Sequence, residues 1–392
     1  MTSTIYIAKS VYGGDGLGRL GDGRVVFVPG AFAGEQVKAE IVAEKRTWVR
    51  ARLIEVVEPS PERIGSGAAP APGMVYHNLS SRGETAAKSL QLAEALRIDS
   101  AKVQHIACGD ELNYRNKVTY HFARQGKSWA IGYLEERTHN VVDVVSDPLA
   151  RPEINAALPA IRQKTIMLLT QGASAVRDAV ARKGSLTIRW SRISGVKWWL
   201  GDADKDCIIR ESTLGKTFEV PADGFWQMNS IVGERLVREV VDEYSRDAAQ
   251  SPNLIDLYCG VGVFGICAAP VRLTGVESGR RAVEFARKNA AANGIQDATF
   301  IAQETCRTLR RLGIDSKTAV ILDPPRGGLE RGVADFLARS RARKILYVSC
   351  DPATLARDLK TLYRTFELKS VKWLNMFPRT ARFESFVTLT RR

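Results

Sequence analysis

The last third of the chain alternates short apolar runs with amphipathic segments, and no other sequence feature limits the possible folds as strongly. The runs have the length of buried strands, and they are Leu254–Tyr258, Leu273–Glu277, Ala298–Ala302, Ala319–Leu322, Lys344–Val348 and Ser385–Thr390. Between two of them, Arg280–Asn293 has helical spacing and is followed by Gly294, a residue type that commonly ends a helix. Repeated strand–helix units of this length predict an α/β domain with a doubly wound, mostly parallel sheet.

The first 58 residues predict a different unit, a small barrel of five short strands. Apolar residues alternate in Ile5–Ala8 and Val25–Val28, and glycine-rich turns interrupt them. The strand-like segments Val37–Val42 and Trp48–Val57 follow. Short strands joined by tight turns are typical of an OB-like barrel.

One strand of this barrel carries a candidate RNA-binding face. Because side chains alternate along a strand, Arg46, Trp48, Arg50 and Arg52 share one side of it. Guanidinium groups bind phosphates and an indole ring stacks on bases, so this face suits single-stranded nucleic acid. A solvated face with a half-buried tryptophan is the alternative.

The middle of the chain predicts a linker and an α+β domain. Residues 59–72 are rich in proline and small residues, which is typical of a linker. Apolar periodicity then predicts helices and strands, namely helix Gly83–Leu96, strands Val118–Phe122 and Trp129–Leu134, helices Arg151–Gln171 and Ala173–Ala181, and a hairpin of Leu186–Ser191 with Val196–Leu200. The three predicted domains therefore span residues 1–58, 59–214 and 215–392.

Composition favours a polyanionic partner and a reducing compartment. The 392 residues carry a net charge of +14, which favours a polyanion as ligand, either nucleic acid or an anionic membrane surface. The sequence has no apolar run long enough to span a membrane and no secretory segment at its start, and its six cysteines include no CxxC pair. We therefore expect a cytoplasmic protein without disulfides or a zinc ribbon, and a monomer by default.

A glycine turn after the first strand of the last third predicts a nucleotide-like cofactor. Asp256–Gly262 reads D-L-Y-C-G-V-G, and Glu277 ends the next strand. Such a turn lets a ligand approach the backbone at the carboxyl end of the sheet, where an acidic residue can accept hydrogen bonds from ribose hydroxyls. At this point both NAD and S-adenosylmethionine fit the pattern.

Two later strand ends shift the prediction toward methyl transfer. Asp323 follows an apolar strand and is held by two prolines, a rigid acidic loop with no obvious use in hydride transfer. Cys350 ends the next strand, ahead of a predicted helix near Ala353 whose N-terminus would favour a thiolate. We interpret Cys350 as a nucleophile, and Cys259 and Cys306 as ordinary buried thiols.

Five motifs in the same order resemble those of the RNA uracil-5-methyltransferases. They are F-W-Q-M-N at Phe225–Asn229, D-L-Y-C-G-V-G at Asp256–Gly262, D-P-P-R at Asp323–Arg326, Y-V-S-C-D-P at Tyr347–Pro352 and M-F-P-R-T-x-x-x-E at Met376–Glu384. The N-terminal barrel is similar to the family's TRAM domain, and Y-R-N-K at Tyr114–Lys117 to its central domain. The resemblance implies a Rossmann-like class I methyltransferase domain that uses S-adenosylmethionine.

The resemblance also implies roles for particular residues. Cys350 corresponds to the nucleophile that adds to carbon 6 of uracil, and Glu384 to the base that removes the proton from carbon 5. Four positions correspond to the cofactor-binding residues of the family, namely Gln227, Tyr258, Glu277 and Asp323. Three arginines are expected near phosphates of an RNA whose target base is flipped out, namely Arg326, Arg379 and Arg382. Residues 330–392 support this with fourteen Lys and Arg against six Asp and Glu.

The chain departs from the family pattern at several positions. Many members bind an iron–sulfur cluster through four cysteines, but residues 66–90 contain none, so we expect no cluster. Arg382 stands where a histidine usually precedes the catalytic glutamate, Asn375 replaces a usual aspartate, and Val263 replaces a polar residue. These changes affect the choice of substrate more than the nucleophile and the base.

The predicted function is methylation of carbon 5 of a uridine in RNA, with 23S rRNA as the first choice because the barrel is present. The same chemistry on a uridine of the tRNA T loop is the nearest alternative. A methyltransferase for exocyclic amino groups could use the D-P-P loop without Cys350, and a cytosine-5 enzyme would carry other motifs. A non-catalytic RNA-binding protein is the alternative from another class.

Overall fold

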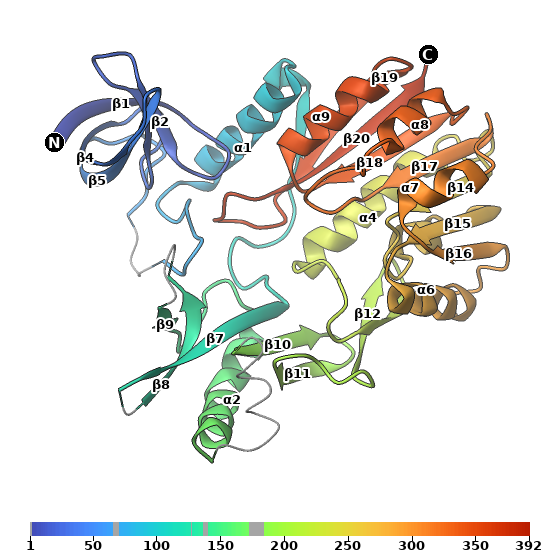
Figure 1. Ribbon diagram of the computed structural model, residues 1–392, viewed down its shortest axis with the longest axis horizontal. Helices are drawn as coiled ribbons and strands as arrows, with labels where there is room; N and C mark the ends of the chain where they lie inside the picture. Colours follow the sequence, from blue (N-terminus) through green and yellow to red (C-terminus); the bar gives the residue numbers. More distant parts are fainter. Residues whose placement is uncertain (1, 66–69, 127, 136–139, 172–183) are drawn as a thin grey trace. The chain divides into compact units, whose positions relative to one another are not determined.

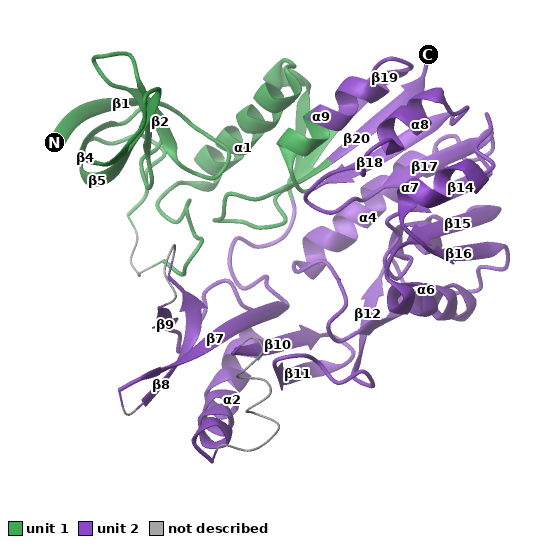
Figure 2. Cartoon of the chain, viewed as in Figure 1, with its two compact units in different colours: residues 1–107, 350–356, 371–385 green, residues 108–349, 357–370, 386–392 purple. Residues whose placement is uncertain are grey.

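The computed structural model describes residues 2–65, 70–126, 128–135, 140–171 and 184–392. The chain forms two compact units, each assembled from separate stretches of sequence (Figure 2). Unit 1 contains residues 1–107, 350–356 and 371–385, and unit 2 contains the rest. The three domains predicted from the sequence divide the chain differently, and their boundaries stay predictions.

Unit 1 begins with a closed five-stranded barrel, as the sequence predicts. Its strands are β1 (Thr2–Ser10), β2 (Gly16–Arg19), β3 (Val25–Val28), β4 (Gln36–Glu44) and β5 (Trp48–Glu58), in the closed order β1-β2-β3-β5-β4. Alternate residues of each strand point inward, among them Ile5, Ile7, Val26 and Val28, and they are almost fully buried. This alternation explains why so short a segment closes into a barrel with an apolar core.

A helix and a short strand follow the barrel within unit 1. The helix α1 (Ser81–Leu96) begins at Ser80, whose hydroxyl accepts a hydrogen bond from the amide of Gly83 at 3.0 Å. The strand β6 (Val103–Ile106) pairs in parallel with the second half of β19 (Phe366–Leu374). The sequence analysis assigned neither strand.

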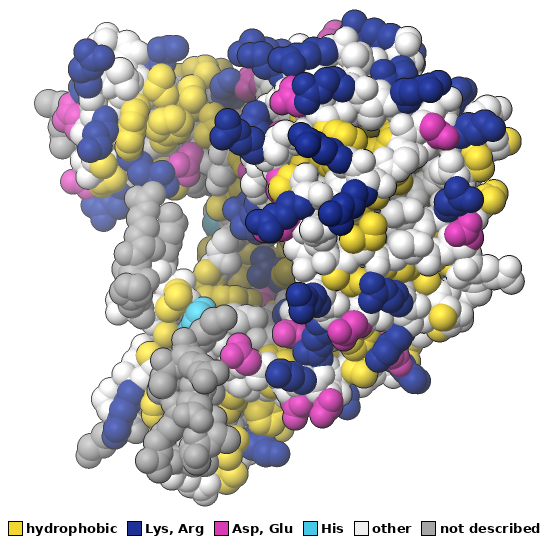
Figure 3. Space-filling model, turned by 45° about the vertical axis from the view of Figure 1, so that its right-hand side comes forward, with side chains coloured by type: hydrophobic (Ala, Val, Ile, Leu, Met, Phe, Trp, Pro, Cys, Tyr) yellow, Lys and Arg dark blue, Asp and Glu magenta, His cyan; other side chains and the backbone are white. Residues whose placement is uncertain are grey.

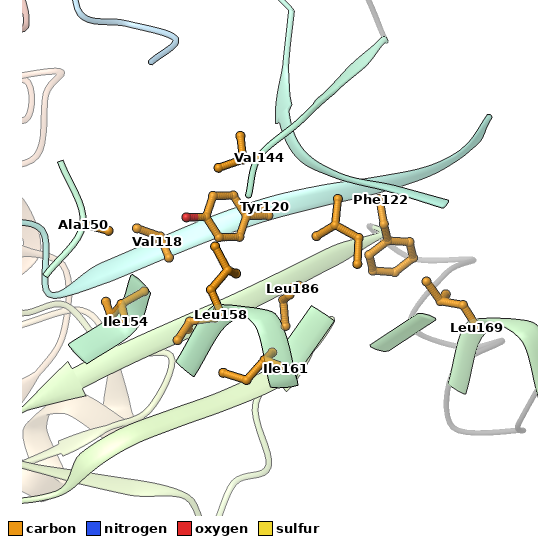
Figure 4. Packing of buried hydrophobic residues seen from close by; sticks show 12 residues of the cluster. Val118, Tyr120, Phe122, Val144, Ala150, Ile154, Leu158, Ile161, Leu169 and Leu186 are labelled. Carbon is orange, nitrogen blue, oxygen red and sulfur yellow. The ribbon is translucent and has the colours of Figure 1, made fainter. Parts of the chain in front are cut away.

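The central part of unit 2 is a five-stranded sheet covered by one long helix. Its order is β11-β10-β7-β8-β9, and the strands are β7 (Lys117–Gln125), β8 (Ser128–Leu134), β9 (Val141–Asp143), β10 (Ser185–Ser191) and β11 (Gly195–Leu200). The helix α2 (Pro152–Gln171) packs apolar residues such as Ile154 and Leu158 against Tyr120 and Leu186 (Figure 4). The helix expected at 173–181 lies outside the described residues.

The C-terminal sheet has eight strands, and its first five confirm the predicted parallel architecture. The order is β16-β15-β14-β17-β18-β20-β19-β6 (Figure 1), with β14 (Asn253–Leu257), β15 (Arg272–Glu277), β16 (Ala298–Ala302), β17 (Thr318–Leu322), β18 (Lys344–Ser349) and β20 (Glu384–Arg391). The pairs β14–β15, β14–β17, β15–β16 and β17–β18 are parallel. Every residue of β17 and β18 is buried, as expected for strands covered on both faces.

Helices and a hairpin complete unit 2. The helices of this region are α4 (Ser230–Ser245), α5 (Val263–Ala268), α6 (Arg280–Ala292), α7 (Thr305–Thr308), α8 (Val333–Arg339) and α9 (Pro352–Leu362), of which α9 belongs to unit 2 only from Arg357 onward. The hairpin of β12 (Ile208–Thr213) and β13 (Lys216–Pro221) is fastened to α6 by Asn289, whose amide group makes hydrogen bonds of 2.8 and 3.0 Å with the backbone of Glu219.

Candidate active site

The turn after β14 has the backbone conformation that the glycine pattern predicts. Gly260 and Gly262 have φ angles of +53° and +89°, and Tyr258 also has a positive φ of +65°. A positive φ is costly for a residue with a side chain, and such strain is concentrated at ligand-binding sites. A Cβ on Gly262 would lie 2.8 Å from Ile266 Cδ1, so both the conformation and the space require glycine there.

Glu277 supports this turn from the neighbouring strand. Its carboxylate accepts hydrogen bonds from the amide of Gly260 at 3.2 Å and from the amide of Gly279 at 2.7 Å. Glu277 is the last residue of β15, which lies parallel to β14. The predicted acidic residue is therefore placed at the carboxyl end of the sheet and touches the glycine turn.

A cavity within unit 2 brings together three of the four predicted cofactor residues. Gln227, Tyr258 and Asp323 line it, together with Phe225 and Trp226, the end of β12, the first turns of α4 and the glycine turn. Glu277 does not line the cavity, but its carboxylate accepts a hydrogen bond from the amide of Gly260, a residue that does line it. The lining combines apolar surface with carboxylates.

Two carboxyl groups under this cavity have raised pKa values. Burial raises the pKa of Asp323 to about 7, and burial together with the nearby Asp323 and Glu277 raises that of Asp256 to about 7. One oxygen of Asp256 accepts a hydrogen bond from the amide of Gly265 at 3.0 Å, and the other has no partner in the structure. Perturbed carboxyl groups in a cavity are typical of a functional site. Sequence reasoning did not single out Asp256, although it opens the D-L-Y-C-G-V-G motif.

The segment that carries Gln227 is held by the central sheet. Asn116, in the Y-R-N-K motif, donates from its side chain to the carbonyl of Gln227 at 2.9 Å and to Ser230 Oγ at 2.9 Å. The buried guanidinium of Arg189 binds the carbonyls of Ala222 and Gly224 at 3.2 and 3.1 Å. The asparagine of Y-R-N-K therefore acts on the cavity through the backbone of Gln227.

Cys350 lies in unit 1, at the first residue after β18. Its side chain is half-buried. Asp351 Oδ1 accepts hydrogen bonds from the amides of Ala353 and Thr354, both at 3.0 Å, and so caps the start of α9. The predicted helix after the cysteine is confirmed.

Glu384 also lies in unit 1, at the start of β20, and it is buried. The loop before it is anchored to α1 by a buried ion pair of that helix, Lys88 Nζ with Glu84 Oε1 at 2.7 Å, because both residues also bind loop atoms. Lys88 also donates to Asn375 Oδ1 at 2.7 Å and to the carbonyl of Arg382 at 2.9 Å. Asn375 returns a hydrogen bond of 2.8 Å to Glu84.

This geometry explains why an amide can stand where the resemblance places an aspartate. Because Glu84 already supplies the carboxylate, Asn375 can accept from Lys88 and donate to Glu84 at once. Neither Lys88 nor Glu84 was found from the sequence, since both lie almost three hundred residues before the loop that they hold.

The expected RNA-contacting arginines have different surroundings. Arg50 pairs with Asp15 at 2.9 Å and Arg52 pairs with Glu40, whereas Trp48 is 37% exposed and meets Phe27 edge-on. Arg46 is exposed but lies in the bend before β5, which begins at Trp48, so the prediction that it shares a strand face with the other three is wrong. Figure 3 shows Lys and Arg side chains spread over one face of the molecule.

Arg379 is placed unlike the other expected RNA contacts. It is buried, and its guanidinium donates to the carbonyl of Leu79. Its amide donates to both carboxylate oxygens of Glu84 at 3.1 Å. This placement gives Arg379 a structural role, and we do not propose it as a phosphate contact. Arg326 is exposed, whereas Arg382 is partly buried and lies near Tyr12.

The two cysteines interpreted as ordinary buried thiols differ in exposure. Cys259 is buried as expected, and burial raises the pKa of its thiol well above the usual value. The expectation of a buried thiol is wrong for Cys306, which is exposed because α7 lies at the surface. Within the described ranges, no three His, Cys, Asp or Glu side chains are placed to share a metal ion, and the lack of an iron–sulfur cluster stays a prediction.

Taken with the fold, the glycine turn, the acidic strand end and the cavity define an α/β protein that binds a nucleotide-like ligand at the carboxyl end of its sheet. Of the helices that the structure describes, none combines the length and apolar character needed to cross a lipid bilayer.

Comparisons with known proteins identify the family. The model of the tRNA (Uracil-5-)-methyltransferase family matches residues 210–392, and that of the TRAM domain matches residues 5–54. An uncharacterized RNA methyltransferase of Aquifex aeolicus is 30% identical over 98% of this chain and 97% of its own. The 23S rRNA (uracil(1939)-C(5))-methyltransferase RlmD of Dichelobacter nodosus is 28% identical over 97% of this chain and 96% of its own.

A solved structure supports the same assignment at the level of the fold. The crystal structure of Pyrococcus abyssi tRNA (uracil-54, C5)-methyltransferase, in complex with S-adenosyl-L-homocysteine, matches with a TM-score of 0.76 at 23% identity. The match covers 98% of this chain and 100% of that one. The chain belongs to the RNA uracil-5-methyltransferase family, and its N-terminal barrel is a TRAM domain.

Proposed function

We propose that this enzyme methylates carbon 5 of a uridine in 23S rRNA through a covalent bond between Cys350 and carbon 6 of the base. The observation that carries the proposal is the order of the strand ends. Tyr258, Asp323 and Cys350 are the residues that directly follow β14, β17 and β18, which are adjacent parallel strands. Ligands of open α/β sheets bind at this edge.

The residue types at these strand ends suit each step of the chemistry. The Cys350 thiolate forms a bond to carbon 6, and the electrons of the carbon 5–carbon 6 double bond move to make carbon 5 nucleophilic. Carbon 5 would then bond to the methyl group of S-adenosylmethionine, whose carbon–sulfur bond would break to release S-adenosylhomocysteine. Glu384 takes the proton from the methylated carbon 5. The double bond forms again, and the bond between sulfur and carbon 6 breaks.

The cavity in unit 2 fits S-adenosylmethionine, which supplies the methyl group. Its apolar and aromatic lining suits an adenine ring, and Asp323 and Glu234 can attract the positive charges of the sulfonium and amino groups. The carboxyl of Asp323 and the amide side chain of Gln227 can make hydrogen bonds with such a ligand.

For the RNA, we propose contacts on the barrel and near the strand ends. The exposed groups Arg46 and Trp48, with Arg50 and Arg52 beside them, would bind phosphates and stack on a base. Arg326 and Arg382 would meet phosphates nearer the target uridine. We propose that the enzyme works as a cytoplasmic monomer without an iron–sulfur cluster.

The test is methyl transfer from labelled S-adenosylmethionine to unmodified 23S rRNA and to bulk tRNA, with product nucleosides identified by mass. We expect 5-methyluridine in 23S rRNA with the wild type and none with Cys350→Ala. Cys306→Ala is the matched control, because this exposed thiol should be dispensable. Labelling of tRNA instead would correct the substrate. Activity that survives Cys350→Ala would refute the covalent scheme.

A further inference from the structure

A tyrosine of the TRAM barrel lies against the segments that carry both proposed catalytic groups. Tyr12 is in the turn between β1 and β2, within unit 1. Its hydroxyl donates a hydrogen bond of 3.2 Å to the backbone carbonyl of Cys350. Its ring meets the ring of Phe383 edge-on, with centroids 6.0 Å apart and an interplanar angle of 90°. Phe383 directly precedes Glu384.

Hydrogen bonds and an ion pair fix the turn that carries Tyr12. The amide of Val11 binds the carbonyl of Asp15 at 2.9 Å, which closes the turn. Gln91 of α1 donates to the carbonyls of Ser10 and Val11, both at 3.1 Å. Because Asp15 also pairs with Arg50 of β5, both the barrel and the helix fix this turn.

The surroundings of the Tyr12 hydroxyl favour a neutral donor. Burial and the nearby Asp351 raise its pKa to about 12, so it keeps its proton at physiological pH. The guanidinium of Arg382 lies 3.5 Å from the hydroxyl oxygen and can donate to it. Arg382 is the residue that stands where the family usually has a histidine, so this contact belongs to a departure of the chain from the family pattern.

Phe383, which the Tyr12 ring contacts, is also held in place by its neighbours. Phe383 is fully buried, and its ring also packs edge-on against Trp373, with centroids 5.4 Å apart. Trp373 is in turn tied to α1 by a hydrogen bond of 2.9 Å from its indole nitrogen to Ser89 Oγ. A shift of the Tyr12 ring would therefore open a gap beside the residue that precedes Glu384.

We propose that Tyr12 is a positioning residue for methyl transfer, through which the TRAM barrel acts on the chemical step as well as on RNA affinity. The hydroxyl holds the peptide that carries the nucleophile, and the ring holds the strand start that carries the base. The inference rests on the proposed function of Cys350 and Glu384. It assigns the hydroxyl to the first step, formation of the bond to carbon 6, and the ring to the last step, removal of the proton from carbon 5.

The experiment separates the two contacts with two variants. Tyr12→Phe removes the hydrogen bond but keeps the ring, whereas Tyr12→Leu removes both. The control is Tyr6→Phe, the same change at a barrel tyrosine that is 61% exposed. The probes are in vitro transcripts of 23S rRNA and tRNA made with uridine or with 5-fluorouridine. A base cannot remove fluorine from carbon 5 as it removes a proton, so the bond between sulfur and carbon 6 cannot break and the covalent adduct accumulates.

For Tyr12→Phe we expect adduct formation on the 5-fluorouridine transcript to be about fivefold to tenfold slower, the effect of one lost hydrogen bond. The KM for RNA should equal that of Tyr6→Phe, and the melting temperature should fall by only a few degrees, the cost of one lost hydrogen bond. For Tyr12→Leu we expect turnover of the uridine transcript to fall by a larger factor than adduct formation does, because removal of the proton is also slowed.

Two outcomes would overturn the inference without touching the proposed function. One is an adduct that forms as fast in Tyr12→Phe as in the wild type. The other is a raised KM for RNA with kcat unchanged, which would make Tyr12 an RNA contact. If the wild type forms no adduct on either transcript, the covalent scheme and this inference fall together.

Discussion

Replacing Lys88 by methionine tests how the segment before Glu384 is held. Lys88 is fully buried, and its ammonium group has oxygen partners on α1 and on the loop between Leu374 and Glu384. Methionine fills the volume of the methylene chain, so the main loss is the charge and its hydrogen bonds. Removing one partner of a buried ion pair costs about 3–5 kcal/mol, because the remaining charge stays buried.

The structure places the expected cost at the lower end of that range. After the substitution, Glu84 keeps the side-chain amide of Asn375 at 2.8 Å and the backbone amide of Arg379 at 3.1 Å. We therefore expect the free energy of unfolding of unit 1 to fall by about 3 kcal/mol. At 1.4 kcal/mol per factor of ten, this equals roughly a hundredfold faster hydrogen exchange in α1 and in residues 375–385.

The assay is hydrogen–deuterium exchange followed by mass spectrometry, which reports each unit separately. Lys9→Met is the matched control, because Lys9 pairs with Glu94 of the same helix at 2.7 Å but both side chains are solvent-accessible. It should cost under about 1 kcal/mol. Adding Glu84→Gln to Lys88→Met should recover part of the loss, since the unpaired charge is gone. Equal exchange in Lys88→Met and Lys9→Met would refute this explanation.

The free energy of unfolding of Lys88→Met should also depend on pH differently from that of the wild type. Burial lowers the pKa of Lys88 to about 8, below the ordinary value near 10.4. Between these two pH values the unfolded chain binds the proton more tightly, so the free energy of unfolding of the wild type rises with pH. Lys88→Met lacks this rise. The stability difference between the two proteins should therefore widen from pH 8 to pH 10.

Three further predictions concern unit 2. Asp323→Asn should be more stable than the wild type at pH 8, by up to about 4 kcal/mol, and equal to it near pH 4. The reason is that burial raises the pKa of Asp323 to about 7, so the wild type loses stability as pH rises from 4 to 7. Thermal unfolding at several pH values would show this difference. Gly262→Ala should cost about 1–2 kcal/mol and weaken binding of S-adenosylmethionine in calorimetry, because φ is +89° and Ile266 blocks the Cβ. Arg189→Met should cost about 3 kcal/mol in urea unfolding, because it leaves the buried Glu211 of β12 without its partner at 3.1 Å. A matching loss in Arg210→Met, an exposed arginine of the same strand β12, would contradict this reasoning.

The strands of the C-terminal sheet could be predicted because each is a short apolar run with a glycine, proline or polar residue at its end. β19 and β6 escaped prediction for a physical reason. In the first half of β19 the exposed Glu367 and Lys369 alternate with the half-buried Leu368 and Ser370, so no apolar run marks the strand, and β6 is only four residues long. Both belong to the sheet through pairing between segments more than 260 residues apart, which local patterns do not encode.

The residues of the site likewise divide into those that a local sequence pattern marks and those that it does not. Gln227, Tyr258 and Asp323 could be selected from the sequence because motifs and strand ends mark them, and the structure places all three on one cavity. Their roles toward the cofactor stay predictions. Tyr12 and Lys88 carried no local signal, because the partners of each lie in segments that only the folded chain brings near.

Unit 1 is assembled from segments that are far apart in the sequence, which affects how it folds during synthesis. The carbonyl of Arg382 that accepts a hydrogen bond from Lys88 is 294 residues further along the chain. At about 5–20 residues per second, a ribosome synthesises Arg382 roughly 15–60 s after it synthesises Lys88 of α1. During this interval the apolar side of α1 and its Glu84–Lys88 pair lack the loop that later buries them. The nascent protein therefore passes through a period in which its barrel can be complete while the loop that binds Glu84 and Lys88 has not yet been synthesised.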